Sequence, residues 1–192
     1  MSDHDVSKRK VLVIVTNYGV EQDELVVPLD HLRGWGAQVD VAAVTMDAVE
    51  TLVGDKTPGR TLDPDLTLDD ADPAGYDLLL VPGGTLNADT LRMQSSAGRI
   101  VRAFSAAGSP VAAICHGPWV LVEADVVRGK QLTSYASLQT DIRYAGGDWV
   151  DQPVVTDESG GWKLITSRNP DDLEPFVREI DAAIAVSGLS GP

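Results

Sequence analysis

The chain has 192 residues, of which 43% are apolar, and a formal net charge of −14. This length and composition are typical of one folded domain with a single core and are too apolar for an intrinsically disordered chain. The acidic balance argues against binding to nucleic acid or to an anionic membrane, because both would repel it.

Several other function classes are disfavoured by the sequence. It has no run of about 18 apolar residues that could span a membrane, and residues 1–10 lack the apolar stretch of a signal peptide, so we expect a cytoplasmic protein. Cys115 is the only cysteine, which excludes an internal disulfide and a four-cysteine zinc site. The few histidines form no zinc pattern and no glycine-rich phosphate loop occurs, so we expect neither a metal nor a cofactor.

The predicted elements alternate between strands and helices. Residues 1–8 are expected to form a flexible tail, and 9–192 a single domain. The apolar patterns predict strands at 10–16, 38–44, 76–81, 110–114 and 131–134, and helices at 25–32, 95–107, 118–124, 138–145 and 171–186. Residues 17–21 are expected to turn, 51–70 to form a short hairpin or an excursion, and 149–166 to form a hairpin.

This alternation predicts an α/β fold with a mostly parallel sheet covered by helices on both faces. Sites in such sheets lie at the carboxyl ends of the strands. We therefore expect the segments 17–24, 82–89 and 115–117 to meet at one edge of the sheet.

Cys115 stands where a buried strand turns into a helix, as the residue of a nucleophile elbow does. The helix N-terminus is expected to favour the thiolate and to lower the pKa of the thiol. His116, directly after it, is the candidate general base, since His4 lies in the tail and His31 is expected to pack on the first helix. The alternative for Cys115 is an inert buried residue.

Glu24 at the start of the first helix is expected near Cys115. An ionised carboxylate would raise the pKa of the thiol, so a functional pair requires Glu24 to be protonated and to donate a hydrogen bond to sulfur. The alternative is a carboxylate that merely stabilises the helix dipole.

Three further residues have both a functional and a structural interpretation. Gly83 and Gly84 could let the backbone approach an oxyanion, or could simply form a tight turn. Asp89 could orient a histidine, although aspartate is also common at helix starts.

The chain resembles the DJ-1/PfpI superfamily, and within it the PfpI-like intracellular protease and deglycase branch. The main matching motifs are Gly-Val-Glu-Gln-Asp-Glu-Leu (19–25), Val-Pro-Gly-Gly-Thr-Leu-Asn-Ala-Asp-Thr-Leu-Arg (81–92) and Ala-Ile-Cys-His-Gly-Pro-Trp (113–119). Shorter matches at 132–135, 145–151 and 164–173 follow in the same order. The ordered set spans the chain from about residue 10 to 186, which makes the resemblance specific.

The resemblance implies a flavodoxin-like sandwich with Cys115 as nucleophile, His116 beside it and Glu24 hydrogen-bonded to the cysteine. Gly84 matches the oxyanion glycine, with Gly83 before it, and Tyr135 matches a tyrosine near the site, the alternative being a core or interface tyrosine. Asp89 falls where such proteins place an acid that reaches the site across a subunit interface, which implies a homodimer or hexamer. The family often has proline before this acid, and Ala88 stands there instead.

The sequence therefore predicts a cysteine hydrolase that acts on glyoxal or methylglyoxal adducts or on peptides. Its partner would be a small carbonyl or peptide substrate. The alternatives are a redox or stress sensor, in which Cys115 is oxidised and turnover is incidental, and a holdase-like binding protein. A glutaminase is disfavoured, because no distant histidine is followed two residues later by an acid.

Overall fold

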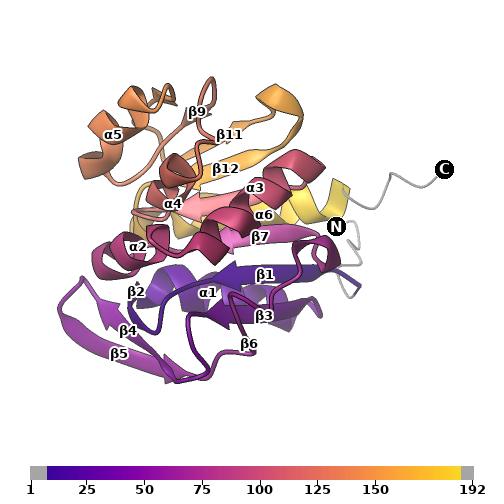
Figure 1. Ribbon diagram of the computed structural model, residues 1–192, viewed down its shortest axis with the longest axis vertical. Helices are drawn as coiled ribbons and strands as arrows, with labels where there is room; N and C mark the ends of the chain where they lie inside the picture. Colours follow the sequence, from indigo (N-terminus) through magenta and orange to yellow (C-terminus); the bar gives the residue numbers. More distant parts are fainter. Residues whose placement is uncertain (1–7, 187–192) are drawn as a thin grey trace.

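The computed structural model describes residues 8–186, and in these a central sheet lies between two layers of helices (Figure 1). Of the predicted tail at 1–8, residues 1–7 lie outside the described part, as do residues 187–192 at the other end. This is the mostly parallel α/β architecture that the alternation of elements predicts.

The central sheet has seven strands, and only its outermost pair, β11 and β12, is antiparallel. In spatial order the strands are β11 (Val154–Asp157), β12 (Leu164–Ser167), β8 (Val111–Ile114), β7 (Leu78–Val81), β1 (Lys10–Ile14), β3 (Gln38–Ala43) and β6 (Leu66–Thr67). The first, third and fourth predicted strands along the chain are thus confirmed as the neighbours β1, β7 and β8, and they end at the same edge of the sheet.

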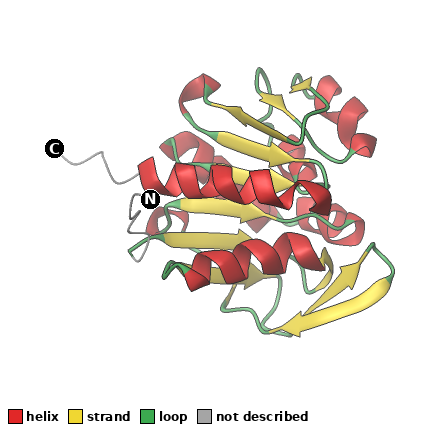
Figure 2. Ribbon diagram, turned by 180° about the vertical axis from the view of Figure 1, so that it is seen from behind, coloured by secondary structure: helices red, strands yellow, loops and turns green. Residues whose placement is uncertain are grey.

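Both faces of the sheet are buried because successive side chains of a strand point to opposite sides. In β1, Val11 and Val13 join one apolar cluster with α1 and α6, whereas Leu12 and Ile14 join the other with α2, α3 and α4. Figure 2 shows two long helices across the sheet as seen from behind. The α-helices are α1 (Gln22–Gly34), α2 (Thr85–Arg92), α3 (Ser95–Ala107), α4 (Pro118–Glu123), α5 (Gln139–Tyr144) and α6 (Leu173–Val186), and the short 3₁₀ helices are η1 (Pro73–Gly75), η2 (Ala136–Leu138), η3 (Ser159–Gly161) and η4 (Pro170–Asp172).

Two segments differ from the prediction. The expected turn at 17–21 is largely a strand, β2 (Tyr18–Glu21), which pairs in parallel with β4 (Val49–Val53). This pairing joins residues about 30 positions apart, so local composition could not indicate it. Strand β4 forms the predicted hairpin with β5 (Thr57–Leu62), and helix α2, which was not predicted, follows the two glycines at 83–84.

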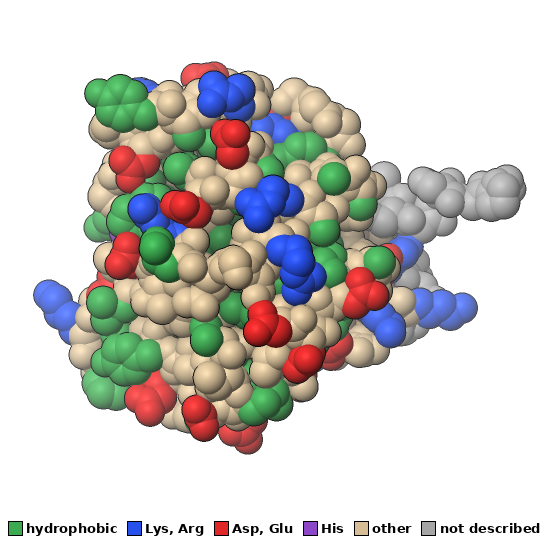
Figure 3. Space-filling view, viewed as in Figure 1, with side chains coloured by type: hydrophobic (Ala, Val, Ile, Leu, Met, Phe, Trp, Pro, Cys, Tyr) green, Lys and Arg blue, Asp and Glu red, His purple; other side chains and the backbone are tan. Residues whose placement is uncertain are grey.

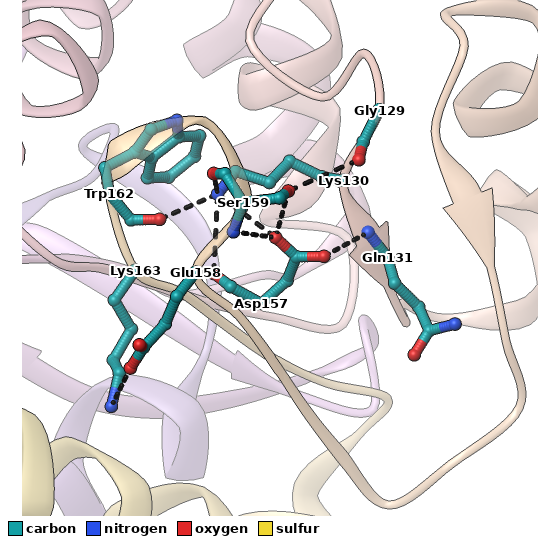
Figure 4. A network of polar contacts seen from close by, with 8 residues as sticks. All are labelled: Gly129, Lys130, Gln131, Asp157, Glu158, Ser159, Trp162 and Lys163. Carbon is teal, nitrogen blue, oxygen red and sulfur yellow. Dashed lines mark hydrogen bonds and ion pairs between the residues drawn. The ribbon is translucent and has the colours of Figure 1, made fainter.

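A small two-stranded sheet, β9 (Gln131–Leu132) with β10 (Asp148–Trp149), is fixed to the main sheet by Lys130, which directly precedes β9. The buried Lys130 ammonium pairs with the Asp157 carboxylate at 3.2 Å and donates to the carbonyl oxygens of Trp162 (2.7 Å) and Ser159 (Figure 4). Its nitrogen also lies 4.1 Å from the centre of the Trp162 ring. The buried charge is thereby compensated on several sides.

Acidic and basic side chains are interspersed over the face formed by α2, α3 and α4, so the net charge does not collect there in one acidic patch (Figure 3). Among residues 8–186, no helix is both long and apolar enough to cross a membrane.

Candidate active site

Cys115 follows the last residue of β8 and stands at a sharp turn into α4. Its φ of 61° is a left-handed conformation, which costs a non-glycine residue about 1–3 kcal/mol. The turn is held by hydrogen bonds from the Cys115 N–H to the Ser167 carbonyl (2.9 Å) and from the Gly117 N–H to the Ile114 carbonyl (2.8 Å). Gly117 is required here, because a Cβ would lie 2.3 Å from the carbonyl oxygen of Val81. The strained turn fixes the direction of a thiol that is only 7% exposed.

The Glu24 carboxyl lies against this thiol in the first turn of α1 and is fully buried. Its Oε2 accepts a hydrogen bond from the Gly83 N–H at 2.8 Å. Burial raises the pKa of Glu24 to about 8, and hydrogen bonds to Cys115 and Gly83 only partly offset this effect. At neutral pH the carboxyl is therefore mainly neutral and able to donate.

The thiol of Cys115 differs from the sequence-based expectation. Burial, followed by the nearby charge of Glu24, raises the pKa of Cys115, whereas the backbone N–H groups of Gly84 and His116 lower it by a smaller amount. The expectation of a lowered thiol pKa was wrong because it considered the helix N-terminus and omitted the loss of solvent. A resting thiol of this kind needs a base before it can attack.

His116 is placed to be that base. Its Nδ1 lies 3.3 Å from the Cys115 sulfur, and its other nitrogen, Nε2, faces the hydroxyls of Ser137 (3.2 Å) and Thr85 (3.5 Å). Burial lowers the pKa of His116, and the charge of Asp55 opposes this effect. The imidazole is consequently neutral at pH 7 and can accept a proton.

Gly83 and Gly84 bring the end of β7 close to the sulfur. Gly84 has φ of 84°, and a Cβ there would lie 2.2 Å from the Gly19 carbonyl oxygen. At Gly83 a Cβ would lie 2.6 Å from the Glu24 carboxylate and 2.8 Å from the Cys115 Cβ. With these side chains absent, the N–H groups of Gly84 and His116 can lower the pKa of Cys115 and could stabilise an oxyanion formed beside the sulfur.

These groups surround an open cavity of about 450 Å³. It is lined by Glu21, Asp23, Glu24, Val53, Gly54, Asp55, Gly84, Thr85, Cys115, His116, Tyr135, Asn169 and Pro170. The lining includes all three segments that were expected to meet at the sheet edge, and the convergence is confirmed. None of the described lining residues is a lysine or an arginine.

Asp89 is the predicted site residue that the structure does not bring to this cavity. It is exposed on α2 and is not among the residues of its own chain that line the cavity. The segment before it is well held despite the missing proline, because Asn87 accepts a hydrogen bond from the Thr16 N–H (2.8 Å) and donates to the Gly83 carbonyl (2.9 Å). The role of Asp89 stays a prediction.

Sequence reasoning missed Asp55, Thr85 and Ser137. Asp55 belongs to the turn between β4 and β5, and its composition alone suggested only an acidic hairpin. Thr85 directly follows Gly84, and that position was the only available signal. Within residues 8–186, no group of three or more His, Cys, Asp or Glu side chains is arranged to hold a metal ion.

The chain is similar to known proteins in sequence and in fold. The sequence model of the DJ-1/PfpI family matches residues 9–183. The protein/nucleic acid deglycase 2 of Escherichia coli is 38% identical over 171 residues, which are 89% of this chain and 95% of that protein. The deglycase PfpI of Pyrococcus furiosus is 35% identical over 170 residues, which are 88% and 96% of the two chains.

Solved structures with the same fold include DJ-1beta of Drosophila melanogaster. It aligns with a TM-score of 0.78 and 32% identity, over 93% of this chain and 91% of that one. A two-domain protein of Anabaena variabilis, with DJ-1/ThiJ/PfpI-like and ferritin-like domains, aligns with a TM-score of 0.84 and 32% identity. That match covers 96% of this chain and 50% of the other.

Proposed function

The chain belongs to the DJ-1/PfpI family, and from this membership and its site we propose a cysteine-dependent hydrolase that removes glyoxal and methylglyoxal adducts from amines or thiols. The observation that carries the proposal is the 3.3 Å approach of the Cys115 sulfur to the Nδ1 of a neutral His116 at a strained turn. Peptide hydrolysis would use the same nucleophile on a less reactive carbonyl.

The reaction begins when the Cys115 sulfur attacks the adduct carbon and His116 Nδ1 accepts the thiol proton. For a methylglyoxal adduct, the amine leaves with a proton, and a hemithioacetal stays on the enzyme. Transfer of a proton from this carbon to its neighbour, again through His116, gives a 2-hydroxyacyl thioester without any external oxidant or reductant. Water then hydrolyses the thioester to lactate and restores the thiol, so that one water molecule is consumed per adduct.

The surrounding groups support each step. The N–H groups of Gly84 and His116, which lower the pKa of Cys115, would stabilise the negative charge that develops on oxygen. Glu24 is mainly protonated below about pH 8, so the charge by which its ionised form opposes the thiolate is largely absent at neutral pH.

Steady-state turnover tests the proposal. Purified protein is given methylglyoxal-modified N-acetylarginine, and the released lactate and N-acetylarginine are both measured. Cys115→Ser should lower kcat/KM by about a thousandfold or more, because loss of a nucleophile removes the reaction path. Asp63→Asn, an exposed site outside the cavity, should retain wild-type turnover. Turnover that is equal in wild type and Cys115→Ser would end the proposal.

Oligomerisation is part of the proposal. As the resemblance to PfpI-like proteins implies, a homodimer or hexamer would bring the exposed Asp89 of one subunit to the site of another. Mixed oligomers of Cys115→Ser and Asp89→Ala subunits should then recover activity, because one site in such an oligomer has both residues. Mixtures as inactive as the separate variants would contradict a contribution across the interface.

One observation favours a second candidate, the redox sensor. The buried Oε1 of Glu24 has no nitrogen or oxygen partner among the described residues, so a protonated Glu24 could donate to an oxygen added to the sulfur. Two equivalents of peroxide would convert the thiol to a sulfinic acid and release water. Mass spectrometry after mild peroxide treatment should show the added oxygens on Cys115, and an unmodified Cys115 would exclude the sensor.

A further inference from the structure

The neutral imidazole of His116 can hold its one proton on either nitrogen, and only one arrangement lets it act as a base towards Cys115. Nδ1 faces the sulfur at 3.3 Å, so it must be unprotonated to accept the thiol proton. The proton must then be on Nε2, and an acceptor must face that nitrogen. The groups around Nε2 therefore determine whether the base is ready.

Thr85 is such an acceptor because its own proton is used elsewhere. The Thr85 hydroxyl donates to Oδ2 of Asp55 at 2.6 Å, and the Thr85 N–H donates to Oδ1 at 2.9 Å. A carboxylate only accepts hydrogen bonds, so the hydroxyl proton lies towards Asp55. The Thr85 oxygen can then only accept from His116 Nε2, which lies 3.5 Å away.

The β4–β5 turn holds the Asp55 carboxylate where it can accept both hydrogen bonds from Thr85. Its φ of 58° places it in the left-handed region, which aspartate tolerates in tight turns, and Gly54 before it has φ of 62°. The Gly54 N–H donates to both carboxylate oxygens of Glu21, at 3.1 and 2.9 Å, and so ties the tip of the β4–β5 hairpin to the end of β2. The hairpin thereby carries a charge of the same chain into the wall of the cavity.

We propose that Asp55 is a positioning residue of the site, which through Thr85 selects the Nε2-protonated form of His116 and leaves Nδ1 free to take the proton of Cys115. This deepens the proposed function and rests on it. The hydrogen-bonded series Asp55–Thr85–His116–Cys115 lies within one chain and needs no second subunit to form.

The Ser137 hydroxyl competes with that of Thr85 for the hydrogen bond to His116 Nε2. Its hydroxyl oxygen lies nearer to Nε2, at 3.2 Å, and its proton can point towards or away from the imidazole. A donating Ser137 would force the proton of His116 onto Nδ1 and disable the base. The Asp55–Thr85 pair offers only an acceptor and so favours the active form.

The influence of Asp55 on His116 can be measured by titration, because the two groups interact through charge. The charge of Asp55 raises the pKa of His116 against the lowering effect of burial. The other titratable groups that line the same cavity come from several elements. They are Cys115 in the same turn as His116, Asp23 and Glu24 in α1, Glu21 in β2, Asp55 in the β4–β5 turn and Tyr135 before η2.

The test is an NMR titration of the full-length protein labelled with ¹⁵N-histidine, in which the signals of His116 are assigned by comparison with His116→Gln. Wild type should show mainly the Nε2-protonated form. Asp55→Asn should lower the pKa of His116, because the charge that raises it is removed, and both Asp55→Asn and Thr85→Val should shift the population towards Nδ1 protonation. Asp63→Asn removes an equal charge between β5 and β6, outside the cavity, and should change neither.

A second readout is the alkylation of Cys115 by iodoacetamide between pH 6 and 9, which needs no substrate. Asp55→Asn and Thr85→Val should slow it about tenfold near pH 7 and leave the folded fraction intact, since general base assistance is lost. The proposal would be overturned if His116 populations and alkylation were both unchanged in Asp55→Asn and Thr85→Val. It would also be overturned if Ser137→Ala changed them and neither of these two variants did. Because neither measurement uses an adduct, absence of turnover would count against the proposed function and not against this inference.

Discussion

The imidazole of His116 stacks on the phenol ring of Tyr135, with ring centres 4.7 Å apart and 24° between the planes. Tyr135 is 44% exposed and lines the cavity, so its ring covers one face of the imidazole while part of the residue meets solvent. The N–H of Tyr135 donates to the Cys115 carbonyl at 2.8 Å, which joins the two segments. The stack therefore restricts rotation of the His116 imidazole ring.

We expect Tyr135→Phe to retain activity and Tyr135→Ala to reduce it. An aromatic pair contributes about 0.5–1.5 kcal/mol, which corresponds to a loss of roughly two- to tenfold in kcat/KM for Tyr135→Ala. Steady-state kinetics on both variants check this expectation. Equal losses in the two would show that the hydroxyl, rather than the stack, is what the site uses.

Glu24 should make stability depend on pH. Its pKa is about 8 in the folded chain and about 4.3 when unfolded, so the folded state binds more protons between these values. Its contribution is fully present below about pH 4.3 and is lost as the pH rises through about 8. The free energy of unfolding of wild type should thus fall relative to that of Glu24→Gln between pH 5 and 8.5. Urea denaturation of both proteins across this range measures the difference, and parallel curves would mean that Glu24 titrates normally.

The parts of the fold that were predicted are those whose signal is local. The apolar runs that became β7 and β8 indicated buried strands by composition alone, and their carboxyl ends had to lie at one edge. Cys115 and His116 followed from the end of β8 at that edge, and Glu24 from the segment after β1 at the same edge. What remained hidden depends on distant pairing, as β2 shows, or on a helix such as α2 that begins after glycines without a polar cap.

The same reason explains why Asp55 was among the missed site residues. Asp55 acts through Thr85, which is 30 positions away, and through a hairpin whose tip is tied to Glu21. Composition shows an acidic, glycine-containing hairpin, and nothing in it distinguishes Asp55 from the exposed Asp63. The thiol pKa was misjudged for a related reason, because burial is a property of the assembled core.

Lys130 should be the costliest polar side chain to remove from the network in Figure 4. Its side chain is 3% exposed and that of its partner Asp157 15%. Lys130→Met therefore removes the cation from a poorly solvated carboxylate, which keeps only its hydrogen bonds from Gln131 and Ser159, and takes the Lys130 donor from the carbonyls of Trp162 and Ser159. We expect a loss of about 3 kcal/mol in the free energy of unfolding. Lys163→Met breaks the pair with the largely exposed Glu158 nearby and should cost less than about 1 kcal/mol. Comparable losses in the two variants would contradict the importance of burial.

The acidic lining of the cavity should select substrates by charge. Glu21, Asp23 and Asp55 line it and no lysine or arginine does so among the described residues. Burial raises the pKa of Glu21, and the exposed Asp23 and the hydrogen-bonded Asp55 supply the negative potential. A cationic adduct should therefore concentrate in the cavity, whereas an anionic one is repelled.

Two methylglyoxal hemithioacetals with the same reacting group separate this effect from chemistry. That of 2-(dimethylamino)ethanethiol is cationic, and that of 3-mercaptopropionate is anionic. We expect kcat/KM to favour the cationic substrate by about tenfold at low salt, with the ratio falling towards one near 1 M salt as charges are screened. Asp23→Asn should reduce the ratio at low salt, whereas Asp63→Asn should not. A ratio that is independent of salt would show that shape, and not the acidic lining, discriminates between the two substrates.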